Sequence, residues 1–159
     1  MKKILFISFI TFIIDFISKI LVKSNLILYK QIAVIDNFLY LTYTNNYGAA
    51  FSILKNSKIF LIIIGLIILI YLVLYIKKHE PKKVIEIIAY GLLIGGILGN
   101  LYDRVVYGYV IDFLDFYIFG YDFAIFNIAD SFIVIAIILL FINTILGGDG
   151  NEDNYSRRK

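Results

Sequence analysis

The sequence has no cysteine, one histidine, and charged side chains at only 17% of its 159 positions. Without cysteine the chain forms no disulfide or thiolate metal site, and a cysteine nucleophile is excluded. The histidine, His79, lies in a lysine-rich stretch without other ligand residues nearby, so a metal site that uses histidine is not expected, and only one built from carboxylates stays open. The net charge is only +3, and the basic residues lie at segment ends, which gives no support to nucleic-acid binding.

Charge is scarce because 61% of the residues are hydrophobic. A soluble domain of this size could not remove so much apolar surface from water, so lipid is the simpler solvent. The length accommodates about four spans of roughly 20 residues each and modest loops. We therefore expect an all-α membrane protein with four transmembrane helices in one domain, residues 1–146. The polar residues 147–159 then form a disordered cytoplasmic tail.

The four predicted helices are four apolar stretches, at about residues 4–22, 59–76, 84–102 and 125–146. The second stretch is the clearest, since it contains no charged residue. The third contains Gly91, Gly95 and Gly99 at a four-residue spacing, which places small residues along one helix face. This ridge predicts close helix–helix packing.

Lysine and arginine positions predict the topology. Basic residues precede the first stretch, cluster between the second and third, and end the chain, whereas the loops at 23–58 and 103–124 have fewer. We therefore expect both termini in the cytoplasm and these two loops on the outer face. Residues 31–44 are rich in β-branched and aromatic residues, which predicts a small β-sheet on the outer face between the first and second helices.

Ionisable side chains inside lipid are costly, and each is a functional candidate. Asp15 and Lys19 are spaced i, i+4 and can pair on one helix face, either as structural support or as part of a site. Asp103 and Arg104 end the third stretch, where an ordinary interfacial ion pair is an equally good interpretation.

A group of aspartates lies between the outer ends of the third and fourth helices: Asp103, Asp112, Asp115, Asp122 and Asp130. Asn127 and Asp130 fit a helix N-cap followed by an acid, which is a purely structural role. Asp112, however, lies in an apolar run that is not typical of a loop, and we expect it to meet Asp130 at the membrane boundary. Two carboxylates in a poorly hydrated site share a proton, so one activates water while the other donates to the leaving amine.

Five short motifs resemble those of bacterial lipoprotein signal peptidases, also called signal peptidase II, in order along the chain. They are Asp15-Phe-Ile-Ser-Lys19, Asn46-Tyr-Gly-Ala-Ala-Phe51, Gly99-Asn-Leu-Tyr-Asp-Arg104, Gly108-Tyr-Val-Ile-Asp-Phe113 and Phe126-Asn-Ile-Ala-Asp-Ser131. Phe16, Ser18 and Ala124 depart from the family, which usually has Gln, Thr and Pro there.

The resemblance implies an intramembrane aspartyl endopeptidase that cleaves diacylglyceryl-modified prolipoproteins just before the lipidated cysteine, with Asp112 and Asp130 as catalytic residues. It implies substrate-binding roles for Asn46, Gly48, Asn100, Arg104 and Asn127, and supporting roles for Asp15, Lys19 and Asp103. It further implies no cofactor or metal, and a monomer surrounded by lipid in the bacterial inner membrane, with the site toward the periplasm.

Two other functions remain open on the residues alone. The membrane carboxylates could relay protons in a small proton- or ion-coupled transporter, although the four helices show no internal repeat. The glycine ridge could instead be the contact face of a non-enzymatic assembly subunit.

Overall fold

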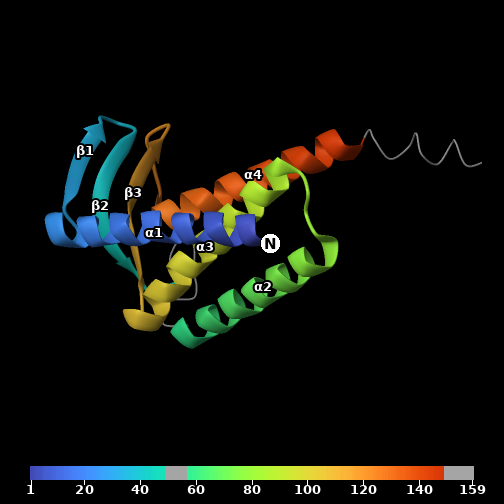
Figure 1. Cartoon of the computed structure of the whole chain (residues 1–159). Coiled ribbons are helices and arrows are strands. Elements are labelled where there is room, and N and C mark those ends of the chain that lie inside the picture. The colour runs from blue at the N-terminus through green and yellow to red at the C-terminus, as the bar shows by residue number, and fades with distance from the viewer. Residues whose placement is uncertain (49–56, 149–159) are drawn as a thin grey trace, which may run out of the picture.

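The computed structural model, which describes residues 1–48 and 57–148, contains four long helices and a four-stranded sheet (Figure 1). The helices are α1 (Lys2–Asn25), α2 (Lys58–His79), α3 (Val84–Val106) and α4 (Ile128–Gly148). The strands are β1 (Gln31–Ile35), β2 (Leu39–Asn46), β3 (Val110–Ile118) and β4 (Tyr121–Phe126). Each helix is long and apolar enough to cross a bilayer, as the sequence predicted. Residues 149–159 of the predicted tail lie outside the described part of the chain.

Helix α3 is the centre of the bundle, because α1 and α4 both pack closely along it. The predicted glycine ridge lies in the contact with α1. A Cβ atom at Gly91 would meet Ile7, and one at Gly95 would lie 2.6 Å from the backbone oxygen of Ser8. Helix α2 diverges from the other helices and approaches only α3 closely among the described elements (Figure 1). The glycines therefore allow two helix backbones to approach each other, as predicted.

The sheet is larger than the sequence predicted. Its strands are antiparallel in the order β1-β2-β3-β4, and only β1 and β2 come from the predicted region between the first two helices. The other two come from the loop between α3 and α4. The first four residues of β3, Val110–Phe113, are buried on both faces, so they lack the alternation that identifies a half-exposed strand.

The fourth helix begins three residues after its predicted start at about residue 125, and the residues before it form a strand. Ile125 and Phe126 pair with Asp115 and Leu114 of β3, and α4 begins only at Ile128. Apolar composition does not distinguish a buried strand from the first turn of a membrane helix, which explains the error. The other helix ends fall within a few residues of their predicted positions, and α3 continues to Val106.

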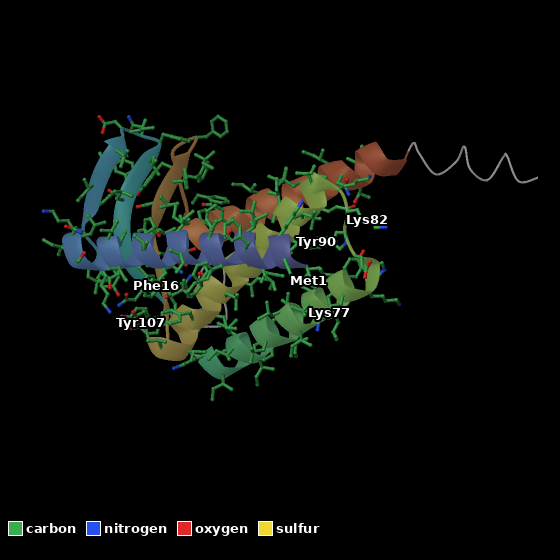
Figure 2. The ribbon with its side chains drawn as sticks, viewed as in Figure 1. Met1, Phe16, Lys77, Lys82, Tyr90 and Tyr107 are labelled. Atoms are coloured by element: carbon green, nitrogen blue, oxygen red, sulfur yellow. The ribbon has the colours of Figure 1, made fainter. Side chains whose placement is uncertain are left out.

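The sheet lies at the end of the bundle where α1 and α3 end and where α2 and α4 begin (Figure 1). A cluster of Val22, Tyr43, Ile111 and Phe113 fixes it against the end of α1. Met1, Lys77 and Lys82 lie at the opposite end of the bundle, as Figure 2 shows. The described basic regions, at the start of α1 and between α2 and α3, are therefore at the end of the protein opposite the sheet. The sequence assigned these regions and the sheet to opposite sides of the membrane.

Replacing Gly95 by Ala should destabilise the protein by about 1–3 kcal/mol, because the added methyl group overpacks the contact between α1 and α3. Gly65→Ala in α2 is the matched control. Its Cβ would lie 3.5 Å from Leu101, an ordinary contact, so the substitution should be neutral or stabilising by up to ~1 kcal/mol. Thermal unfolding in detergent measures both. Equal stability of the two variants would contradict the close approach of α1 and α3.

Candidate active site

Asp112 and Asp130 come from different elements, β3 and the first turn of α4, and meet at one asparagine. The side-chain amide of Asn127 donates a 2.7 Å hydrogen bond to Asp112 Oδ1. The backbone N–H of Asn127 donates a 3.2 Å hydrogen bond to Asp130 Oδ2. Both acids line the same cavity, of about 190 Å³. The structure therefore brings together the two carboxylates that the sequence singled out.

Asn127 is also the cap of α4. Its Oδ1 accepts a 2.9 Å hydrogen bond from the backbone N–H of Asp130, while Asp130 accepts the reciprocal bond from the Asn127 backbone. This reciprocal arrangement is a capping box, which satisfies N–H groups at the start of a helix. The structural interpretation of Asn127 and Asp130 is thus confirmed. The cap also aims Asp130 into the cavity, whereas Asn127 is fully buried and reaches the site only through its hydrogen bonds to the two acids.

Two further asparagines complete the hydrogen bonding of the acids. Asn46 Nδ2 donates to Asp112 Oδ2 at 2.8 Å, and Asn100 Nδ2 donates to Asp130 Oδ1 at 2.7 Å. Each of the four carboxylate oxygens therefore accepts a hydrogen bond from a neutral N–H group. Neutral donors orient a carboxylate without fixing its charge as an adjacent cation would.

Lys19 does not contact the two site acids directly, because Asn100 lies between them. Its ammonium group lies 2.8 Å from Asp15 Oδ2, 3.0 Å from Asp103 Oδ2 and 3.1 Å from Asn100 Oδ1. The predicted Asp15–Lys19 pair is therefore present, and Asp103 pairs with Lys19 instead of with Arg104. All four side chains are buried, so the ammonium group is held among three protein oxygen atoms away from the surface.

The two acids that hold Lys19 also hold the backbone of the site. Asp15 Oδ1 accepts a 2.8 Å hydrogen bond from the N–H of Ala129 in α4. Asp103 Oδ2 accepts a 3.1 Å bond from the N–H of Ile111, next to Asp112 in β3. One buried ion cluster thus links α1, α3, β3 and α4, which are the elements that carry or support the two site acids.

Arg104 lines the same cavity from α3. Its Nη2 donates a 2.9 Å hydrogen bond to the backbone oxygen of Gly48, and the Gly48 N–H bonds to Asn46 Oδ1 at 2.9 Å. Gly48 therefore positions Arg104 and Asn46 through its backbone groups. Residues 49–51, the remainder of that motif, lie outside the described residues.

The apolar wall of the cavity was missed by the sequence analysis. It consists of residues from β3, β4 and α4: Val110, Ala124, Ile125, Phe126, Ile133 and Val134. Ile133 and Val134 follow Asp130 by three and four residues, so helical spacing could have placed them on the same face. An apolar wall lowers the local dielectric constant and strengthens the electrostatic interactions of the acids.

Burial and the neighbouring Asp130 carboxylate raise the pKa of Asp112 from its ordinary 3.8 to about 7, although hydrogen bonds from Asn46 and Asn127 oppose the shift. Asp112 can therefore gain or lose a proton near neutral pH. A pair of acids that holds one proton can accept a proton from water and donate one to a leaving group.

Of the other acids in the predicted group, Asp115 lies outside the cavity. It accepts hydrogen bonds from Thr42 at 2.5 Å and from Gln31 at 3.0 Å, and so connects three strands. Among the described residues, no group of three or more acidic, histidine or cysteine side chains is arranged to hold a metal ion.

Comparisons with known proteins cover nearly the whole chain. Residues 7–146 match the family described as Signal peptidase (SPase) II. A lipoprotein signal peptidase from Alteromonas mediterranea is 40% identical over 162 residues, which cover 99% of this chain and 88% of that protein.

Two solved structures described as bacterial membrane enzymes are also similar. One is 39% identical with a TM-score of 0.85, covering 95% of this chain and 92% of that one. The other is 40% identical with a TM-score of 0.81, covering 91% of this chain and 93% of that one. These similarities give no support to the transporter alternative.

Lys19→Ala should destabilise the protein by about 3–5 kcal/mol, because it leaves two buried carboxylates without their cation. The control is Lys23→Ala, one turn further along α1. Lys23 is exposed and lies over the ring of Tyr107, so its loss should cost about 1 kcal/mol or less. Thermal unfolding in detergent, with turnover measured per folded molecule, tests this. Normal stability with abolished turnover of Lys19→Ala would instead give Lys19 a direct catalytic role.

The raised pKa of Asp112 predicts a protonation change near pH 7 that infrared spectroscopy can detect. The carbonyl stretch of a protonated carboxylic acid should be present in infrared spectra below neutrality and disappear with a midpoint at about pH 7. Asp112→Asn should remove this signal, whereas Asp115→Asn should leave it. Because the folded protein holds this proton more tightly than the unfolded chain does, the associated stability is complete below about pH 4. It is lost as the pH rises through about 7. A midpoint near 4 would contradict the coupling of the two acids.

Proposed function

The chain belongs to the signal peptidase II family, and from this we propose that Asp112 and Asp130 are its catalytic residues. The protein is a bacterial membrane peptidase whose family processes prolipoproteins. The observation that supports the catalytic assignment best is the shared position of the two acids. Both line one cavity, and Asn127 donates a hydrogen bond to each.

In the proposed reaction the two acids carry one proton between them. The ionised carboxylate takes a proton from a water molecule as that water attacks the scissile carbonyl carbon. The protonated carboxylic acid donates its proton to the carbonyl oxygen, which gives a tetrahedral diol. As the diol collapses and the C–N bond breaks, the acid that took the water proton passes it to the leaving amine, and the other carboxylate regains its proton from a diol hydroxyl group. The pair ends with one proton again, so the cycle needs no metal or cofactor. A pKa of about 7 for Asp112 suits this exchange at neutral pH.

Arg104 is proposed to bind the substrate. Its planar guanidinium group lines the cavity and is held on one side by the backbone oxygen of Gly48. Such a group presents several donors in one plane, which suits a peptide carbonyl or a lipid ester oxygen. Three asparagines are proposed to orient the two acids toward the bound peptide: Asn46, Asn100 and Asn127.

The proposed substrate is a prolipoprotein whose cysteine already carries diacylglycerol, cut just before that cysteine. The wall of the cavity on the α4 side supports this proposal. Val134 lines the cavity and is 50% exposed on a bilayer-spanning helix, so the cavity lies beside lipid. An acylated peptide can then approach from the membrane without first entering bulk water.

We further propose a monomer in the inner membrane, with both termini in the cytoplasm and the sheet and cavity toward the periplasm. The lysines between α2 and α3, together with Lys2 and Lys3, support this orientation, because short basic loops remain in the cytoplasm. They lie at the end of the bundle away from the sheet (Figures 1 and 2).

Asp112→Asn and Asp130→Asn should each lower turnover of a diacylglyceryl-modified prolipoprotein by about 10²–10⁴-fold or more, because each removes a group that transfers a proton. Asp115→Asn, three residues from Asp112 on the same strand and outside the cavity, is the matched control and should retain most of its activity. The assay uses purified protein in lipid vesicles. Near wild-type turnover by either of the first two variants would refute the assignment, and equal cleavage of unlipidated substrate would refute the proposed substrate.

A further inference from the structure

The turn between β3 and β4 exposes aromatic side chains to an unusual degree. Phe119 is 98% exposed and Tyr121 is 79% exposed. Phe119 and Gly120 form the turn, with backbone φ angles of 53° and 80°. A bulky residue such as Phe is uncommon at positive φ, where Asn, Asp or Gly is preferred. Neither packing nor turn geometry therefore explains a phenylalanine at this position.

The turn lies beside the first turn of α4, at a similar depth along the bundle (Figure 1). β4 is an edge strand. Only Asn127 separates the last residue of β4, Phe126, from α4, so this end of the strand is at the same depth as the start of the helix. β4 has six residues, so at roughly 3.3 Å per residue the turn lies about 20 Å from the helix. Figure 1 shows β3 running across the bundle end and away from the helices. The turn thus extends beside the bundle and not beyond its end.

The residues next to the turn extend the apolar surface. Ile118 pairs directly with Tyr121 across the hairpin, so their side chains are on the same face of the sheet. Phe123, two residues after Tyr121, follows on the same face. Ile118 and Phe123 are each 42% exposed. Contiguous exposed apolar residues of this kind mark a contact surface, and aromatic residues are enriched where proteins meet the membrane–water interface.

We propose that the β3–β4 turn inserts Phe119 and Tyr121 into the interfacial region of the bilayer. The partner is the lipid surface around the helices, with which the turn is continuous through β4 and α4. This contact is a lipid anchor for the sheet in addition to the four helices. It holds β3, and with it Asp112, at a fixed depth. The inference depends on the membrane location of the protein and not on the catalytic assignment.

The other hairpin provides a contrast within the same sheet. Phe38 lies in the turn between β1 and β2, at the edge away from β4. Its ring contacts that of Phe116, with centroids 5.9 Å apart, and it is only 47% exposed. Phe38 is therefore about half as exposed as Phe119 and is packed against a protein ring. Although Val34 and Ile35 of β1 are also exposed, we expect this turn to contact lipid less than the β3–β4 turn does.

The absence of tryptophan from the chain allows a direct test. Phe119→Trp, Phe38→Trp and Phe141→Trp each introduce a single fluorophore. Phe141 lies on α4, is 65% exposed and serves as the reference for lipid contact. Each variant is reconstituted, without substrate, in phosphatidylcholine vesicles with and without brominated acyl chains, which quench nearby tryptophan. Retained peptidase activity confirms that each variant is folded.

Phe119→Trp and Phe141→Trp should both lose fluorescence in the brominated vesicles, and Phe38→Trp should retain more of it. Because Phe38→Trp has the same intrinsic preference for the interface, it controls for attraction by tryptophan itself. Quenching of Phe119→Trp no greater than that of Phe38→Trp would overturn the proposal. A blue-shifted but unquenched emission from Phe119→Trp would also overturn it, because that result indicates contact with protein, such as a second copy of the chain.

Discussion

The arrangement of this protein depends on one buried ammonium group, that of Lys19. Taking a lysine and two carboxylates out of water is costly, and the cost is offset only when the geometry satisfies every group. Here the ammonium group contacts oxygens of Asp15, Asp103 and Asn100, while the two acids accept backbone hydrogen bonds from Ala129 and Ile111. Because those backbone groups belong to α4 and β3, satisfying Lys19 also fixes the two elements that carry the site acids. Fold stability and site geometry are thus set by the same contacts.

Asn100 separates the Lys19 ammonium group from Asp112 and Asp130, and this separation affects how readily the two acids ionise. Asn100 accepts from Lys19 and from Asn127 through Oδ1 and donates to Asp130 through Nδ2. A direct lysine contact would stabilise the ionised carboxylate strongly. Neutral amides orient both acids while leaving burial and mutual repulsion to raise the pKa of Asp112 to about 7. Three asparagine side chains therefore orient the two acids without placing a cation in direct contact with either carboxylate.

The sequence predicted the parts of the fold whose signal is local. The uncharged run of α2 and the four-residue glycine spacing of α3 identified spans and a packing face without reference to any partner. Strand β3 was missed because its first four residues are buried on both faces and lack the alternation of a half-exposed strand. Strand β4 was missed because its last residues, Ile125 and Phe126, continue into the apolar run of the fourth helix. The grouping of Asp112 with Asp130 was predicted, whereas the contacts of Lys19 to Asp103 and Asn100 join residues distant in sequence. No local spacing shows such a contact.

The site combines a strand with a helix, and this combination sets its depth. Edge strands carry unpaired N–H and C=O groups, which the hydrocarbon region does not tolerate, so β4 limits how deeply the site can lie. Asp130 is in the first turn of a bilayer-spanning helix, which limits how far the site can lie outside the membrane. Asn127 joins the two elements and hydrogen-bonds to both acids. These two limits agree with the proposed function, in which the acids lie at the boundary between lipid and water and a peptide bond next to an acylated residue is held there by its own lipid chains.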